Sequence, residues 1–542
     1  MKGENKSEEQ SLGLHSSLKN SKRAKEIIPR SCEELKEQID AIRNGKGKRH
    51  QKLRLISELV KRTLAKRGFF CKVENGTLRP DLYYFDKHGR ELFKFTDEPG
   101  STDPRFLAYL QDLFGLSQKD PETAWLLGDL QLQATRDVKS IRPHKLWYWD
   151  EEHLYLNFHR GRILRIDERG KGKWIPNGKE VFFIDTDLPE GELPKQPHSP
   201  NKILRELFPF EDHGVLTAEE QGVCFLLWAY TLPFGAALGS KPILLLQGEA
   251  GSGKTTLFKV LSALFYGDRT KFSLIGKGDE RDFLTTIANN PLCLFDNVEL
   301  NTKWLEDHLA SLSTGSAIRT RKLYADVGQE LVIRPETWIV LNGISPRVRR
   351  PDVADRLLIL NFHRLSEHER RPESEIVDWI LEYRGELLRG YVSELKRIVK
   401  RLATSEEEFE SPIRMEDWAK LAWQISGHFG CRSTFESALE KVSHRQSEYA
   451  LEDDPLFSAV SIWMERERSQ RDLTASLLLR ELSVVAEREG IDLSYGRKPL
   501  NAISLGKRLN QLKGNFAQVG IRVVVTKASS NKKLYEFHRE TD

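Results

Sequence analysis

Hydrophobic residues follow a helical spacing near the start of the chain and an alternating spacing soon after it. Over residues 33–67, leucine, isoleucine and valine recur every three or four positions, which predicts two helices around a Gly-Lys-Gly-Lys break at 45–48. The segments GFFCKVENG and DLYYFDKHGRELFKF predict short strands, the second with an internal turn at Lys87–Arg90.

The pattern continues with a further helical stretch at 103–137 and alternating aromatic and polar residues over 146–187, which predict a small sheet. These segments predict an α+β N-terminal region at 31–200. The preceding residues 1–30 are polar and lack periodicity, so we expect a flexible basic tail there.

The middle of the chain has a different rhythm. Across residues 201–400, the apolar strands KPILLLQG, NPLCLFDN and ETWIVLNG alternate with helical stretches, which is typical of a parallel α/β sheet. A charged, helical connector is expected at 401–452. The last segment, 453–542, predicts three helices and then two strands.

One uncharged stretch of 20 residues, Gln221 to Ser240, has the length of a membrane span. Pro233 and three glycines interrupt it, and it runs directly into the strand that follows. We therefore expect a buried core helix and turn rather than a membrane helix, and no membrane partner.

Length and charge refine this picture. A chain of 542 residues suggests three or four domains. Its net charge is only +4, but residues 1–70 hold 18 basic against 9 acidic residues and residues 497–539 hold 10 against one. Because the two end segments are basic, the middle of the chain must be net acidic. This distribution favours contact of the two ends with a polyanion. The five scattered cysteines form no disulfide or zinc pattern, and a reducing, cytoplasmic location is expected.

The sequence GEAGSGKT at Gly248–Thr255 matches the phosphate-loop pattern G-x-x-x-x-G-K-[ST], between a predicted strand and a predicted helix. Glycines let backbone N–H groups turn toward phosphate oxygens, and the helix N-terminus adds partial positive charge. Lys254 would reach the β- and γ-phosphates, and Thr255 would ligate Mg²⁺. We expect ATP and Mg²⁺ as cofactors, bound by the following residues: Gly248, Glu249, Ala250, Gly251, Ser252, Gly253, Lys254, Thr255 and Thr256.

A second signal lies about 40 residues on, where the apolar strand Leu292–Phe295 ends at Asp296. A carboxylate at such a strand end can hold the Mg²⁺ shell. Asn297 follows where many ATPases place a catalytic glutamate. Glu299 is the nearest alternative base for the attacking water, although it could instead cap the next helix.

Two further residues complete the candidate catalytic set. Asn342 ends a third apolar strand and could position the water, or it could simply start a turn with Gly343. Arg356 opens a strand-like run and could be presented to the γ-phosphate of a neighbouring subunit. The alternatives are a solvated basic loop or salt bridges to Asp352 and Asp355. Arg350 is the next candidate for an arginine finger, an arginine that one subunit supplies to the ATP site of another.

In their order along the chain, GEAGSGKTT, LCLFDNVEL, LSTGSAIRTRKLYAD, RPETWIVLNGI and RPDVADRLLILNF resemble AAA+ ATPases of phages, plasmids and integrative elements. The set is similar to superfamily 3 helicases and poxvirus-type primase-helicases. The resemblance implies a hexameric ring that translocates on DNA. It assigns the phosphate loop to Gly248–Thr255, the metal-holding acid to Asp296, the sensor to Asn342 and the finger to Arg356. Asn297 departs from that pattern.

In this family, the region between Asp296 and Asn342 carries a hairpin that grips single-stranded DNA in the ring's pore. Here AIRTRKLYADVGQELVIRP predicts strand, turn and strand. Arg319, Arg321 and Lys322 precede the turn and could contact phosphates, or they could carry charge at a subunit interface.

The C-terminal segment predicts helix, helix, strand, wing and strand, the pattern of a winged helix that binds duplex DNA. Its ten-to-one excess of basic residues favours DNA over a protein partner. The candidate DNA-binding residues there are Lys507, Arg508, Lys513, Lys532 and Lys533.

The fold class we expect is α/β: an AAA+ P-loop ATPase core, an α+β N-terminal region and a C-terminal winged-helix domain. The leading function is an ATP-driven, ring-forming DNA helicase or translocase that replicates a mobile element or phage. The alternatives are an ATPase that loads or remodels proteins on DNA, and a DNA-binding regulator that uses ATP as an assembly switch.

Overall fold

A computed structural model of the chain describes most of its residues. The described ranges are 32–73, 81–97, 99–134, 138–158, 161–184, 197–212, 214–274, 280–298, 303–321, 330–333, 337–343, 350–368, 370–405, 407–452, 454–466, 469–495, 498–527 and 533–539. The predicted flexible tail at 1–30 lies outside them. The chain folds into two compact units, and the boundary between them lies between Arg142 and Pro143. The α+β region expected at 31–200 is therefore shared between the two units.

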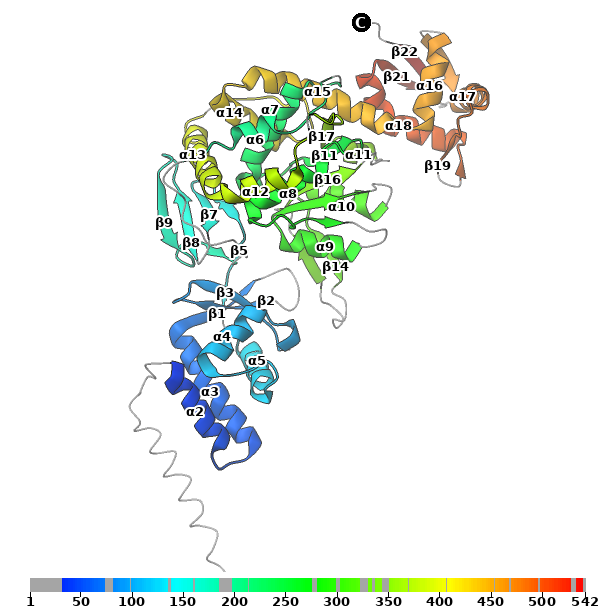
Figure 1. Cartoon of the computed structure of the whole chain (residues 1–542). Helices are drawn as coiled ribbons and strands as arrows, with labels where there is room; N and C mark the ends of the chain where they lie inside the picture. The colour runs from blue at the N-terminus through cyan, green and yellow to red at the C-terminus, as the bar shows by residue number, and fades with distance from the viewer. Residues whose placement is uncertain are drawn as a thin grey trace, which may run out of the picture. The chain divides into compact units, whose positions relative to one another are not determined.

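Among its described residues, the first unit packs four helices against a four-stranded sheet of order β3-β2-β1-β4 (Figure 1). β2 and β3 form the predicted hairpin, with its turn at residues 87–90. Aromatic side chains from the strands and from α4 fill this core, including Tyr84, Phe93 and Phe106. The elements are α2 (Cys32–Asn44), α3 (Arg49–Arg67), β1 (Gly68–Val73), β2 (Asp81–Asp86), β3 (Glu91–Phe95), α4 (Pro104–Phe114), α5 (Pro121–Ala134) and β4 (Lys139–Ser140).

The second unit begins with a small antiparallel sheet of order β6-β7-β8-β9, as the alternation over 146–187 predicts. One face of this sheet contributes Leu154, Leu156 and Leu164 to the large core that follows. Its strands and the short pair beside it are β5 (Pro143–His144), β6 (Trp147–Trp149), β7 (Leu154–Phe158), β8 (Arg162–Ile166), β9 (Gly172–Pro176) and β10 (Phe182–Phe183).

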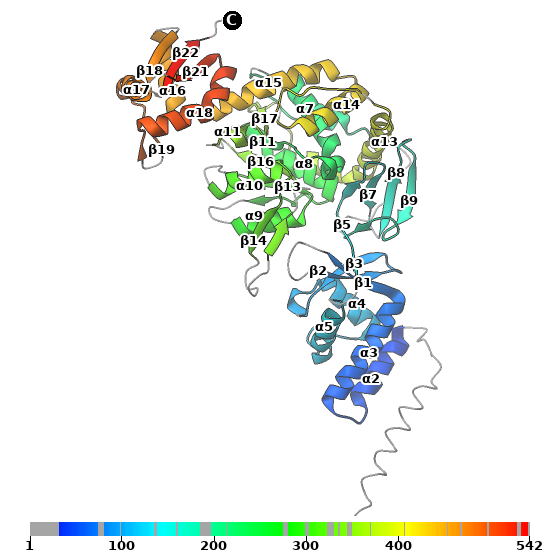
Figure 2. The same ribbon diagram turned by 180° about the vertical axis from the view of Figure 1, so that it is seen from behind.

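A five-stranded parallel sheet of order β12-β13-β16-β11-β17 forms the centre of the second unit (Figures 1 and 2). Its strands are β11 (Ile243–Gly248), β12 (Ser273–Leu274), β13 (Leu292–Asp296), β16 (Trp338–Gly343) and β17 (Leu357–Phe362). Alternate residues of β11 point to opposite faces of the sheet. Leu244 and Leu246 lie in the core on one face, and Ile243 and Leu245 lie in the core on the other. Helices therefore cover both faces, which explains why these strands are continuously apolar.

The two helical layers come from different parts of the chain. On one face lie α6 (Asn201–Glu206), α7 (Ala218–Thr231), α8 (Lys254–Tyr266), α12 (Glu373–Glu382), α13 (Arg384–Leu402), α14 (Glu416–Phe429) and α15 (Arg432–Leu451). On the other face lie α9 (Glu280–Asn289), α10 (Lys303–Ser313) and α11 (Pro351–Ala354). A separate hairpin pairs β14 (Ile318–Arg321) with β15 (Glu330–Ile333).

The uncharged stretch at 221–240 is a core element, as predicted. The stretch forms most of α7 and the 3-10 turn Leu232–Ala237 that follows it. Every residue from Glu220 to Thr231 is buried. None of the helices within the described ranges is long and apolar enough to cross a membrane. The expected core helix and turn are therefore present.

The C-terminal part of the second unit encloses its own core of helices and a three-stranded sheet of order β18-β22-β21. The predicted helices are present and capped, α17 by Thr474 and α18 by Asn501. The strand β18 was not predicted. The elements are α16 (Pro455–Arg466), β18 (Ser469–Thr474), α17 (Ala475–Glu489), β19 (Ser494–Tyr495), β20 (Lys498–Pro499), α18 (Ala502–Gln518), β21 (Ile521–Lys527) and β22 (Lys533–Arg539).

Candidate functional site

The predicted phosphate loop connects β11 to α8, as its sequence requires. Gly248, Gly251 and Gly253 have φ of +150°, +80° and +87°, a region that glycine adopts without steric cost. A side chain at Gly248 would also place its Cβ 2.4 Å from the carbonyl oxygen of Phe362. The glycines of the motif therefore serve the backbone geometry of the loop, which leads directly into the N-terminus of α8.

Lys254, the first residue of α8, folds its ammonium group back across this loop. Its Nζ donates to the carbonyl oxygens of Gly248 (2.6 Å) and Glu249 (2.7 Å) and to Ser252 Oγ (3.1 Å). The side chain is buried, and burial lowers the pKa of Lys254 while the nearby carboxylate of Asp296 opposes that shift. The ammonium group of the lysine is thus held inside the loop by atoms of the loop itself.

Three polar side chains meet at the carboxyl ends of the adjacent strands. Thr255 Oγ1 donates to Asp296 Oδ2 at 3.3 Å, and Asn342 Nδ2 donates to Asp296 Oδ1. β16 lies between β11 and β13, with Leu246 beside Asn342, so the parallel register brings these groups together. The sheet thus gathers predicted residues that are 41 to 46 positions apart from Asp296 in sequence.

Asn342 keeps one unused hydrogen-bonding atom at this point. The residue is 3% exposed, and its Oδ1 accepts no hydrogen bond from any described residue. An unsatisfied buried acceptor is costly in a folded protein, so its presence here is informative. Because Nδ2 is already bonded to Asp296, Oδ1 is the atom that remains available to a ligand or water.

Asn297 turns the chain sharply after Asp296. It has φ of +54°, which is uncommon for a residue other than glycine, and its backbone N–H donates to Asp296 Oδ1 at 2.9 Å. Val298 then donates to the carbonyl oxygen of Asn342 at 2.8 Å. Glu299, the candidate base, lies outside the described residues.

Arg356 and Arg350 share one carboxylate. Arg350 donates to both oxygens of Asp352, at 3.0 and 2.7 Å, and contacts Asp307. Arg356 donates to the backbone oxygen of Asp352 and lies 3.3 Å from its Oδ2. Burial alone would raise the pKa of Asp352, but Arg350, with a smaller contribution from Arg356, lowers it. The alternative salt bridges of these arginines are therefore present to Asp352, whereas Asp355 pairs with Arg414 instead.

Sequence reasoning missed three charged residues that follow β17 and lie beside the phosphate loop. Arg364 Nη1 is 3.9 Å from Glu249 Oε2, and Arg370 Nη2 is 3.8 Å from the position of a Cβ on Gly251. Glu373 accepts from Thr256 Oγ1 at 3.2 Å and pairs with Lys259. Their crowding in HRLSEHERRPE was a signal, but only the pairing of β17 with β11 places that segment at the loop.

The two strands predicted between Asp296 and Asn342 are present as β14 and β15, in antiparallel register with Arg319 opposite Val332 and Arg321 opposite Glu330. Lys322 and the turn lie outside the described residues. The structure therefore has the predicted strands, and the DNA contacts of Arg319, Arg321 and Lys322 stay a prediction.

The C-terminal candidates differ in their surroundings. Lys507 and Lys513 are exposed on α18, and Lys533 is exposed at the start of β22, whereas Lys532 lies outside the described residues. Arg508 donates to Asp454 Oδ2 at 2.6 and 3.0 Å, and Asp454 is 5% exposed. The guanidinium of Arg508 thus neutralises a buried carboxylate that caps α16, and a DNA contact of Arg508 stays a prediction.

Comparisons with known proteins bear on the same region. Residues 222–444, from α7 to α15, match the family model described as actinomycete integrative conjugative element replication protein. A search of curated proteins finds no match. The matched segment contains the phosphate loop, Asp296, Asn342 and Arg356, so the candidate site lies in the part of the chain that is similar to replication proteins of mobile elements.

Solved structures with some likeness include two of the apo NrS-1 C-terminal region. They are 11% and 12% identical, each covering 89% of this chain and 98% of the other, with a TM-score of 0.39. A structure of JCV helicase with a bound small molecule is 15% identical, with a TM-score of 0.22, and covers 41% of this chain and 64% of the other.

Proposed function

We propose that this chain is an ATP-driven, ring-forming DNA helicase or translocase of the AAA+ class that acts in replication of a mobile element. The observation that carries the proposal is the meeting of Thr255, Asp296 and Asn342 beside a phosphate loop. The family match supports the replication context.

The residues of the site suit ATP and Mg²⁺. Thr255 Oγ1 and the Asp296 carboxylate are oxygen ligands of the kind Mg²⁺ prefers, and the ion would neutralise charge on the phosphate groups. The backbone N–H groups of Gly251 and Gly253 and the ammonium of Lys254 would bind phosphate oxygens. The free Oδ1 of Asn342 would accept a hydrogen bond from the attacking water and orient it.

The position of Arg356 supports a shared site between subunits. Its backbone oxygen accepts from Ile243 N at 3.0 Å, which puts Arg356 beside the amino end of β11. The phosphate loop lies at the carboxyl end, five strand residues or about 16 Å away. Arg356 therefore cannot reach its own phosphate loop by a side-chain movement, and its proposed role is to serve the site of the next subunit in a hexameric ring. Leaving the Asp352 pairing would be part of that role.

DNA would contact two parts of the chain. The hairpin β14–β15 would carry Arg319, Arg321 and Lys322 to single-stranded DNA in the pore. The C-terminal domain, with α17, α18, β21 and β22 in the order of a winged helix, would bind duplex DNA through Lys507, Lys513, Lys532 and Lys533. Arg364 and Arg370 join the nucleotide site as candidate phosphate contacts from the same subunit.

A second candidate function is a DNA-bound ATPase that loads or remodels proteins, or that uses ATP as an assembly switch. Asn297 favours it, because an amide cannot accept the proton that a glutamate in its place would take. Slow hydrolysis with intact ATP-dependent assembly would support this alternative.

The experiment measures ATP turnover with and without single-stranded DNA, and strand displacement on a forked duplex. We expect DNA-stimulated turnover and ATP-dependent displacement. Stimulated turnover without displacement would favour the remodelling function, and no turnover with ATP-dependent oligomers would favour the switch.

A further inference from the structure

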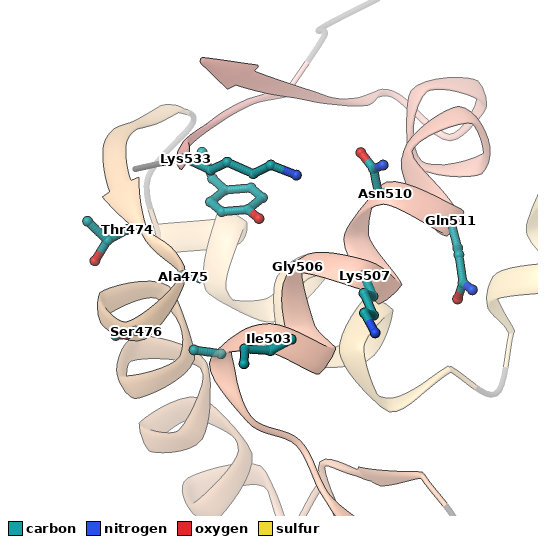
Figure 3. A pocket seen from close by; sticks show the side chains of 11 residues that line it. Thr474, Ala475, Ser476, Ile503, Gly506, Lys507, Asn510, Gln511 and Lys533 are labelled. Atoms are coloured by element: carbon teal, nitrogen blue, oxygen red, sulfur yellow. The ribbon is translucent and has the colours of Figure 1, made fainter. Parts of the chain in front are cut away.

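The C-terminal domain carries a groove of about 740 Å³ beside α18. It lies between α18, the N-terminus of α17 and the start of β22 (Figure 3). α18 contributes Ile503, Lys507 and Asn510, and Lys533 extends from β22 on the other side of the groove. The groove thus combines apolar, amide and cationic side chains on one exposed surface.

The exposed side of α18 is a continuous stripe. Ile503, Lys507, Asn510 and Gly514 recur at three- and four-residue spacing, and all four are exposed. The opposite side of the helix holds Leu505, Leu509, Leu512 and Phe516, which are buried in the domain core. The stripe therefore lies outside the domain core and is open to a ligand.

The composition is unusual for a surface that binds only the DNA backbone. Ile503 is 75% exposed, and an apolar side chain or a neutral amide neutralises no phosphate. An exposed asparagine or glutamine can instead pair with N6 and N7 of adenine, and an apolar side chain can contact the thymine methyl group. Lysines flanking such residues suit the phosphates on either side of a groove.

The helix also has the right dimensions and charge. An α-helix of about 10–12 Å diameter fits the major groove, which is about 12 Å wide. No aspartate or glutamate occurs between residues 498 and 527. Gly506 lets the helix pack closely on β22, because a Cβ at this position would lie 2.6 Å from the hydroxyl of Tyr535. The helix and Lys533 are therefore held as one surface.

We propose that α18 reads base edges in duplex DNA, with Asn510 contacting an adenine and Ile503 a thymine methyl group, while Lys507 and Lys533 contact phosphates. Gln511, also exposed at the groove, would read a neighbouring base. This inference rests on the proposed duplex-binding role of the domain and adds sequence preference to it. The ligand is a duplex site that contains A·T pairs.

The distance between Ile503 and Asn510 along the helix determines the distance between the bases that they would contact. Seven residues separate Ile503 from Asn510, which is about 10 Å along a helix. Base pairs are stacked about 3.4 Å apart, so the two contacts fall about three base-pair steps from each other. The preferred site should therefore hold a thymine and an adenine at this separation.

The test uses the full-length chain and a library of random duplex DNA. Binding and recovery should enrich a motif with A·T pairs about three steps apart. Affinity for the enriched duplex and for a scrambled duplex is then measured across a range of salt concentrations.

The variants separate base reading from charge. Asn510→Ala should lower the affinity of the protein for the enriched duplex by about 5- to 150-fold and leave its affinity for the scrambled duplex unchanged. Lys507→Ala should lower the affinity for both duplexes equally. It should also lower the slope of log affinity against log salt concentration by about 0.9. Gln518→Ala is the matched control, since it removes an exposed amide from the same helix outside the groove, and it should change neither duplex.

The outcomes distinguish this inference from the proposed function. If no motif is enriched, or Asn510→Ala affects both duplexes alike, while Lys507→Ala still weakens DNA binding, base reading by α18 is wrong and duplex binding by the domain stands. If Lys507→Ala and Lys533→Ala leave DNA affinity unchanged, the groove binds another kind of partner, and both the inference and the duplex-binding role are wrong.

Discussion

Lys254 holds its ammonium group inside the phosphate loop through two carbonyl oxygens and one hydroxyl. Lys254→Ala should lower ATP turnover by about 10²–10³-fold or more, because it removes a positioned positive charge at the transferred phosphate. The chain should still unfold in a cooperative thermal transition, since all three hydrogen bonds of the ammonium group are made within the loop itself. Steady-state hydrolysis and a melting curve check both expectations, with exposed Lys271→Ala as the control. Near-normal turnover in Lys254→Ala would remove the loop from the active site.

Glu299 is the acid nearest to Asp296 in sequence that could serve as the base. Glu299→Gln should slow hydrolysis while leaving ATP affinity within about twofold, because an amide of the same shape cannot accept the proton. Turnover and nucleotide binding are measured on the same preparation. If turnover is unaffected, an acid elsewhere polarises the water, and the departure at Asn297 gains weight.

At the level of elements, Glu220 ties the start of α7 to α15. Its carboxylate caps α7 through Thr217 and accepts from Lys441 Nζ (2.6 Å) and Ser437 Oγ (2.8 Å). Burial alone would raise the pKa of Glu220, but these hydrogen bonds outweigh burial and lower it. A lowered folded-state pKa gives stability that is present at neutral pH and is lost as the pH falls through that value.

Lys441→Met should therefore destabilise the second unit by about 1–3 kcal/mol at pH 7, since it leaves a buried carboxylate short of a partner. Its deficit relative to the natural chain should shrink as the pH falls below the ordinary pKa of glutamate and through the lowered folded-state pKa of Glu220, because a protonated carboxyl no longer needs the lysine. Denaturant unfolding over a series of decreasing pH values, starting at pH 7, measures this. Lys420→Met, at an exposed position of α14, is the control. An equal deficit throughout the pH series would contradict the role of the ion pair.

Much of the fold follows from the sequence at this scale, and some of it does not. The buried helix α7, the strand–loop–helix around Lys254 and the strand ends at Asp296 and Asn342 were predictable, because periodicity and special residues report local structure. The order of the strands was not, and it is the order that places β16 between its neighbours and β17 beside the phosphate loop. Arg370 could be recognised at the site only after that pairing was known.

Arg508 shows the same limit on a single helix. Its spacing and charge matched a DNA-binding residue, but the acid that pairs with it, Asp454, lies 54 positions earlier, at the start of another helix. Local pattern cannot report a long-range ion pair. Lys507, Lys513 and Lys533 are exposed, so they remain candidate phosphate-binding residues.

At the scale of the whole molecule, DNA binding should depend on the exposed lysines of the C-terminal domain. Combining Lys507→Ala, Lys513→Ala and Lys533→Ala should lower the slope of log affinity against log salt by about 0.9 for each phosphate of duplex DNA that is no longer neutralised. Fluorescence anisotropy on a duplex across salt concentrations measures the slope. An unchanged slope would mean that this domain contacts protein instead.

Mixing two inactive variants shows most directly whether neighbouring subunits share one ATP site. Arg356→Ala should bind nucleotide yet lose about 10³–10⁵-fold in turnover, and Lys254→Ala should also be inactive. In mixed assemblies of the two variants, a sound phosphate loop on one subunit can meet a sound arginine on the next, so turnover should partly return. If demonstrably mixed assemblies show no recovery over either variant alone, Arg356 does not act between subunits and the shared-site ring is wrong.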